Sequence, residues 1–250
     1  MAILILGRRS LIFPNCSVYP RMSLCLRAPV EIQNLLPYDF KYRIYDKNTK
    51  KDWTNFLRKG GLSPVHVVEL SHLLLLGIQM EGTPYKPSDF GIINAKKAGE
   101  FERETQLVVT DDEGLKLQLK LHYLEFPDGG GSFRVIVYCP YVILNKTGLD
   151  IQVKSKAFLQ QAKTTAGQLK SASGEHSAAP YMFSYRTEER GNRAVLRVGD
   201  SNWSRPQSFE AIGSIIDVVL PAAAKQEEIH VGISVDEGEG KASRLGSQKC

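Results

Sequence analysis

Two asparagines, Asn34 and Asn145, occupy the same point in two similar segments of the chain, where a predicted strand meets a predicted turn. An asparagine amide suits such a junction because it can hydrogen bond to nearby backbone groups and tolerates a positive φ. The first interpretation is structural, with each amide locking a strand to its turn. The amide could also shape a groove for an extended peptide. The two roles are compatible, because a fixed junction also fixes the surface above it.

Residues that could catalyse a reaction or hold a metal are dispersed. The five histidines (66, 72, 122, 176 and 230) are scattered, and His66 and His72, on either side of Glu69, do not by spacing alone make a zinc triad. The acidic residues Asp111 to Glu113 precede Gly114, which is typical of a hairpin turn. No P-loop, nucleophile elbow or zinc-protease motif occurs. We therefore predict no enzyme, no metal and no cofactor.

A second candidate site is the segment from Phe40 to Gly60, in which basic residues alternate with aromatic ones. Its candidate lipid contacts are Lys41, Arg43, Lys50, Lys51 and Lys59. Such a segment can contact an anionic membrane surface or single-stranded nucleic acid. It also fits a strand with one buried face. The net charge of +5 over 250 residues is small for a nucleic-acid footprint, so no nucleic-acid partner is expected.

The elements that position these residues are predicted to be strands. Apolar residues alternate with polar ones from Leu115 to Tyr123, and similar alternation begins at Phe133, Ala194 and Ile229. A period of two places the apolar side chains on one face of a strand. Long helical periodicity is absent. The predicted class is all-β, of the sandwich type.

An internal repeat organises these strands. Residues 30–43 match residues 141–154 without gaps, so that Asn34 aligns with Asn145, 111 residues later. Residues 86–90 match 205–209, and the strand from Leu117 matches the strand from Ile229. Three collinear matches indicate two tandem β-sandwich-like repeats of about 110 residues. The expected division is an irregular N-terminal edge (1–22), a first repeat (23–138), a second repeat (139–241) and an irregular tail (242–250).

Composition limits the remaining possibilities. Apolar residues make up 42% and charged residues 24% of the chain, as in soluble globular proteins. The longest aliphatic run, Leu73 to Ile78, is far below the roughly 18 residues that span a bilayer. The four cysteines are scattered and are expected to be reduced thiols in the cytosol.

Several segments give the chain a family resemblance. NLLPYDFKYRIYDK, PYVILNKTGLDI, AIGSIIDVVLP and HVGISVDEGEGK resemble the adaptor-binding region of the vacuolar protein sorting-associated protein 13 family, also called the SHORT-ROOT-binding-like domain. The similarity extends from about Ser23 to Lys241. In that family the region is a string of β-sandwich repeats, each marked by an asparagine, and Asn34 and Asn145 match those positions.

The resemblance implies a non-enzymatic module of a bridge-like lipid transfer protein. Its expected partners are adaptors with proline-x-proline motifs, which recruit the protein to organelle contact sites in vacuolar protein sorting and Golgi retention. The expected location is cytoplasmic and peripheral, at endosome, vacuole, Golgi or mitochondrial contact sites. The lipid channel is not in this piece, and residues 242–250 depart from the family pattern. The alternative is a peripheral module that binds anionic lipid headgroups through the segment from Lys41 to Lys59.

Overall fold

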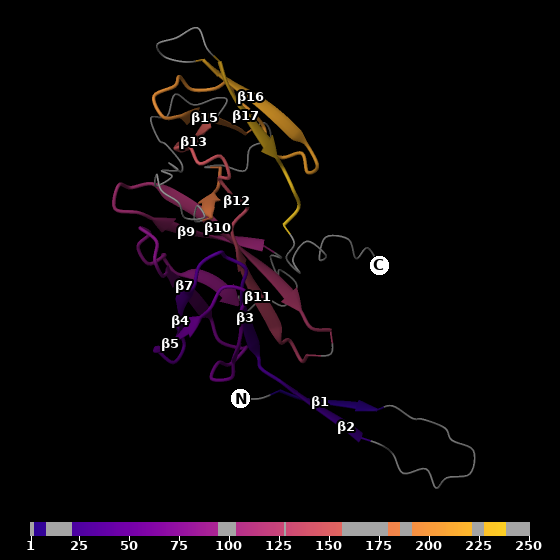
Figure 1. The fold of residues 1–250 in the computed structure, drawn as a ribbon. Helices are drawn as coiled ribbons and strands as arrows, with labels where there is room; N and C mark the ends of the chain where they lie inside the picture. The colour runs from indigo at the N-terminus through magenta and orange to yellow at the C-terminus, as the bar shows by residue number, and fades with distance from the viewer. Residues whose placement is uncertain are drawn as a thin grey trace, which may run out of the picture. The chain divides into compact units, whose positions relative to one another are not determined.

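The structure is a computed structural model, and it describes residues 3–8, 22–94, 104–127, 129–156, 180–185, 192–221 and 228–238. These residues form strands and turns, which confirms the predicted all-β class (Figure 1). Within these ranges no helix is long and apolar enough to cross a membrane. The chain divides into two compact units, one of residues 1–107 with 119–138 and the other of residues 108–118 with 139–250.

The larger sheet contains five strands in the order β6-β3-β11-β10-β9. β11 runs parallel to β3, and β10 is antiparallel to β11. Leu117, Leu119 and Leu121 of β10 are at most 2% exposed, as the period-two pattern predicts. The strands are β3 (Val30–Asn34), β6 (Leu62–Val65), β9 (Glu104–Thr110), β10 (Lys116–Glu125) and β11 (Phe133–Tyr138).

A second sheet of the first unit has the order β5-β4-β7-β8. Its strands are β4 (Phe40–Asp46), β5 (Lys51–Leu57), β7 (Leu74–Met80) and β8 (Gly91–Asn94). Phe40, Tyr42 and Ile44 are buried while Lys41 and Arg43 are exposed, so β4 has one buried face. A hydrogen bond of 2.8 Å between Tyr42 Oη and Ser63 Oγ joins β4 to β6 of the larger sheet. The buried faces of the two sheets therefore meet in one core.

The second unit contains three antiparallel strand pairs, β12–β14, β13–β15 and β16–β17. Phe183, Ala194, Leu196, Val218 and Leu220 lie at the centre of its core. The strands are β12 (Tyr141–Ile143), β13 (Ile151–Lys156), β14 (Tyr181–Phe183), β15 (Arg193–Val198), β16 (Ile215–Pro221) and β17 (Glu228–Ser234).

Strand pairings of the two units correspond. β4 pairs with β7 as β13 pairs with β15, and β3 pairs with β6 as β12 pairs with β14. Ser88 also has a counterpart: its Oγ accepts a hydrogen bond from Ile78 N, and Ser204 Oγ accepts one from Leu196 N in the same way. The division into two tandem repeats stays a prediction.

The serine pair corrects one detail of the repeat alignment. The gapless match places Ser88 opposite Gln207, whereas the backbone hydrogen bonds make Ser204 its counterpart. Ser88 and Ser204 each donate their backbone N–H to the carbonyl of the strand residue that their hydroxyl also binds. Loop insertions shift the alignment by a few residues, while the register of the strands is set by backbone hydrogen bonds.

The N-terminal region departs from the irregular structure expected for residues 1–22. β1 (Ile3–Arg8) pairs in antiparallel fashion with β2 (Met22–Arg27). The aliphatic run at the N-terminus has high strand propensity and finds a complementary strand in residues 22–27. The predicted tail at 242–250 lies outside the described residues.

Candidate functional site

Asn34 ends β3 and is completely buried. Its Oδ1 accepts a hydrogen bond of 2.9 Å from Leu36 N, and its Nδ2 donates one of 2.9 Å to Tyr38 O. The same Nδ2 lies 3.3 Å from Leu57 O, at the last residue of β5. The backbone of Asn34 also exchanges hydrogen bonds with Gly60 and Gly61, in the turn after β5. This one residue therefore ties the end of β3 to the end of β5.

Asn145 makes the same local bonds in the second unit. Its Oδ1 accepts a hydrogen bond of 3.1 Å from Thr147 N, and its Nδ2 donates one of 2.7 Å to Leu149 O. The acceptor bond therefore reaches two residues ahead and the donor bond four residues ahead, as at Asn34. Asn145 differs in being only partly buried. Replacing Asn145 should therefore leave fewer buried hydrogen-bonding groups without a partner than replacing Asn34.

The five predicted lipid-contact residues do not form one patch. Lys41 and Arg43 lie on the outer face of β4, where Lys41 Nζ is 2.8 Å from Glu81 and Arg43 Nε is 2.6 Å from Asp52. Each of these cations therefore already has a carboxylate partner. Surface ion pairs of this kind contribute little to stability, but they reduce the charge available to a lipid.

The other three lysines lie at the two ends of β5. Lys50 is in the β4–β5 turn with a φ of 59°, and Lys51 is opposite Asp46 in the strand register. Lys59 follows the other end of β5, where its backbone N–H donates to Asp39 Oδ1 at 2.8 Å. Lipid contact by these lysines stays a prediction.

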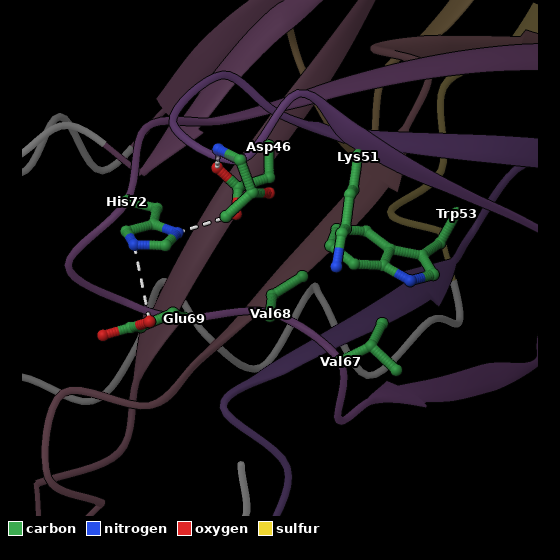
Figure 2. A pocket seen from close by; sticks show the side chains of 8 residues that line it. Asp46, Lys51, Trp53, Val67, Val68, Glu69 and His72 are labelled. Atoms are coloured by element: carbon green, nitrogen blue, oxygen red, sulfur yellow. Dashed lines mark hydrogen bonds and ion pairs between the residues drawn. The ribbon is translucent and has the colours of Figure 1, made fainter.

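A pocket of about 190 Å³ opens beside the β4–β5 hairpin, and Figure 2 shows its residues. Lys51 and Trp53 line one side, and Asp46, Glu69 and His72 line the other (Figure 2). Trp53 is opposite Ile44 in the register, so it shares the inner face of the sheet although it is only partly buried. Thr49, Val67 and Val68 complete the lining.

The polar side of the pocket is held by Asp46, whose side chain is 3% exposed. Burial alone would raise the pKa of this carboxyl, but hydrogen bonds from His72, Thr49 and Asn48 outweigh it and lower the pKa to about 2. Asp46 is therefore an ionised acceptor at neutral pH, so His72 Nδ1, at 2.7 Å, must carry the proton. His72 Nε2 lies 3.4 Å from Glu69.

The pocket combines an apolar side with a histidine that is held between two carboxylates. The two carboxylates contact opposite nitrogens of the His72 ring instead of converging on a common point. Among the described residues no group of three or more His, Cys, Asp or Glu side chains could hold a metal ion. Trp53, Val67 and Val68 provide the apolar surface, next to the cationic Lys51.

Trp53 belongs to the segment of basic and aromatic residues between Phe40 and Gly60, but its sequence context does not identify it as a site residue. The pairing of Ile44 with Trp53 decides which face the ring occupies. Val67 and Val68 come from the connection after β6 and carry no pattern of their own. The cluster of Glu69 and His72 is visible in the sequence, but its partner Asp46 is 26 residues from His72.

Comparisons with known proteins agree with the resemblance. The chain is 55% identical over 226 residues to the Intermembrane lipid transfer protein VPS13 of Chaetomium thermophilum, covering 89% of this chain and 7% of that protein. It is 25% identical over 224 residues to Vps13D of Drosophila melanogaster, covering 88% of this chain and 5% of the relative. VPS13D of Homo sapiens is 23% identical over 232 residues, with coverages of 89% and 5%.

These relatives are named as intermembrane lipid transfer proteins, and this chain spans only a small part of the length of each one. Residues 12–244 match the family described as "Vacuolar-sorting associated protein 13, adaptor binding domain". The match includes both asparagines, the β4–β5 hairpin and the pocket beside it. The chain therefore belongs to the family of adaptor-binding domains of vacuolar-sorting associated protein 13.

Proposed function

We propose that this chain binds adaptor proteins and thereby recruits a longer lipid transfer protein to organelle membranes and their contact sites. The observation that carries the proposal is the match of residues 12–244 to an adaptor-binding domain. The protein acts from the cytoplasm, peripherally, at endosome, vacuole, Golgi or mitochondrial contact sites. Its roles include vacuolar protein sorting and Golgi retention, and its adaptors carry proline-x-proline motifs.

The edge of β5 is the surface that we assign to the adaptor peptide. In the described part of the chain β5 has one neighbour, β4, and it is the longer of the two edge strands of its sheet. An exposed edge can accept an extended peptide as an additional strand. Side chains of such a peptide would alternate between the pocket at Trp53 and the outer face, where Phe56 is 44% exposed.

Proline-x-proline spacing suits this mode of binding. In a strand, the backbone groups of successive residues point to opposite edges. When the central residue pairs with β5, both prolines direct their nitrogens away from the sheet, where no N–H is required. Both rings also lie on the same face, and flat proline rings pack well on an aromatic side chain such as Trp53.

Asn34 holds the C-terminal end of β5 in place through hydrogen bonds. Its Nδ2 binds Leu57 O at the end of β5, and its backbone binds the turn that follows. An alanine at this position should loosen the edge and weaken peptide binding without any direct contact between Asn34 and the peptide. Asn145 lies in the second unit, and its part in adaptor binding stays a prediction as well.

Titration of the 250-residue chain with a synthetic peptide that contains one proline-x-proline motif tests the proposal. Trp53→Ala should weaken binding about tenfold or more, because a central aromatic side chain typically dominates such contacts. Trp203→Ala, an equal truncation in the other unit, is the matched control and should bind normally. A peptide whose prolines are replaced by alanine should bind less well.

The two titrations distinguish an error in the position of the peptide site from an error in the proposed motif preference. If Trp53→Ala binds the peptide as tightly as the unmodified chain, the peptide site is not at β5. Absence of binding to any proline-x-proline peptide would refute the motif preference of this chain. The alternative function, lipid binding through Lys41 to Lys59, is less favoured because Lys41 and Arg43 are paired with carboxylates.

A further inference from the structure

The second unit carries a basic face on the outer side of the β13–β15 pair. Ile151 and Val153 point into the core, so Lys154 and Lys156 point outward from β13. On β15, Ala194 and Leu196 are in the core, Arg193 and Arg197 alternate with them and are partly exposed, and Val195 between the two arginines is buried. The basic face consists of Lys154, Lys156, Arg193 and Arg197, together with Trp203.

Positive charges crowd this face. Lys156 lies directly opposite Arg193 in the strand register, a like-charge pair that destabilises a sheet. Lys154 Nζ is 3.9 Å and Arg197 Cζ is 4.9 Å from the centre of the Trp203 ring, so both cations gather on one aromatic group. Burial, Arg197 and Lys156 together lower the pKa of Lys154.

No carboxylate in the described part of the chain forms an ion pair with these four cations, and the side chain of Arg197 donates a hydrogen bond of 2.6 Å to the neutral Gln152 besides its contact with Trp203. The first unit differs at the corresponding outer positions. There Lys41 and Arg43 are neutralised by Glu81 and Asp52. The outer face of β4 therefore carries cations that are paired with carboxylates, whereas the four cations of the basic face have no such partner among the described residues.

We infer that the basic face of the β13–β15 pair is a docking surface for the anionic headgroups of a membrane. The cations are spread over two neighbouring strands, about 7 Å apart along a strand and about 5 Å apart between strands. Such a spread complements the distributed charge of an anionic leaflet better than a single phosphate group. Trp203 adds an aromatic ring of the kind that favours the membrane interface. This surface goes beyond adaptor binding and uses other residues.

Sedimentation of the 250-residue chain with vesicles tests the inference. Binding to phosphatidylcholine with about 30% phosphatidylserine should exceed binding to phosphatidylcholine alone, and it should fade between about 0.1 M and about 1 M salt. The double variant Lys156→Gln with Arg193→Gln should reduce the partition coefficient about 25-fold, or about fivefold for each charge.

Two control variants make the result specific. Lys41→Gln with Arg43→Gln removes the same net charge from the outer face of the first unit and should reduce binding less than about fivefold. Lys156→Arg with Arg193→Lys keeps the charge and should bind normally. Thermal melts should show that the neutralised Lys156 and Arg193 variant is no less stable, because it loses a like-charge pair.

Equal losses in the two neutralised double variants would overturn the inference, because binding would then follow net charge alone. Binding that ignores phosphatidylserine or salt would also overturn it. Binding to a polyglutamate peptide but not to anionic vesicles would assign the basic face to an acidic protein segment instead. A proline-x-proline peptide should still bind the variant that lacks Lys156 and Arg193 charges, which separates this test from that of the adaptor site.

Discussion

Replacement of Asn34 by alanine should destabilise the first unit substantially. Asn34 is completely buried and makes three side-chain hydrogen bonds, to Leu36 N, Tyr38 O and Leu57 O. Each such bond contributes about 1 kcal/mol net, and a buried partner left unsatisfied costs about 1–3 kcal/mol. We therefore expect Asn34→Ala to reduce the free energy of unfolding by about 3 kcal/mol. Asn145→Ala should cost about 1 kcal/mol, because water can replace its bonds.

The chain offers a reporter for each unit, since it has two tryptophans, Trp53 in the first unit and Trp203 in the second. In a Trp203→Phe background, urea unfolding followed by fluorescence reports on Trp53 and its surroundings. In a Trp53→Phe background the same measurement reports on Trp203. Asn34→Ala should lower the midpoint reported by Trp53 much more than Asn145→Ala lowers the midpoint reported by Trp203.

Gln33→Ala is a suitable control for Asn34→Ala. Gln33 precedes Asn34 on β3 and is only partly buried, and its Oε1 accepts a weak bond of 3.5 Å from Arg134. Its replacement should change stability by no more than about 0.5 kcal/mol. An equal loss of unfolding free energy in Asn145→Ala and Asn34→Ala would contradict the role assigned to the buried Asn34 amide, and so would a loss in Asn34→Ala no larger than that of the control.

Three further outcomes follow from other buried groups. The pKa of Asp46 is lowered from 3.8 to about 2 in the folded state, so the ionised carboxylate contributes about 2 kcal/mol to the free energy of unfolding above about pH 4. This contribution should vanish as the pH falls towards 2. When the free energy of unfolding is measured against pH, Asp46→Asn should lack that loss. Burial raises the pKa of the Cys139 thiol to about 12, which keeps the thiol protonated and unreactive. In a variant whose other cysteines are serine, a thiol reagent at pH 8 should therefore label Cys139 only after urea unfolding. Ser204→Ala should lower the free energy of unfolding by about 1–3 kcal/mol, because the N–H of Leu196 loses its buried acceptor. Ser88→Ala, at a less buried position, should lower it less in the same denaturation assay.

Local patterns in the chain were sufficient to predict several of the strands. The alternation of Phe40, Tyr42 and Ile44 with Lys41 and Arg43 predicts a strand with one buried face, and the structure has it. Asn34 could be singled out because it recurs at Asn145, and because an amide at a strand end has few other uses. Such inferences succeed where the controlling interactions are between near neighbours in the sequence.

Groups brought together from distant segments were not predictable in this way. Residues 1–22 were expected to be irregular, yet Ile3–Arg8 pairs with Met22–Arg27. The pairing of Lys41 with Glu81 is set by the register of β4 with β7, and the five residues predicted to contact lipid are divided between the outer face of β4 and the two ends of β5. Lys156 and Arg193 of the basic face are 37 residues apart and face each other only because β13 pairs with β15.

The amino-acid order alone determined the all-β class, the buried faces of the strands and the two marked asparagines, because side chains alternate along any strand regardless of its neighbours. Only the tertiary structure decided that Asn34 anchors the end of β5, that Trp53 lines a pocket with His72, and that Lys156 and Arg193 lie opposite each other on the β13–β15 pair. Those facts depend on strand register, and a shift of one residue would have turned each side chain to the opposite face.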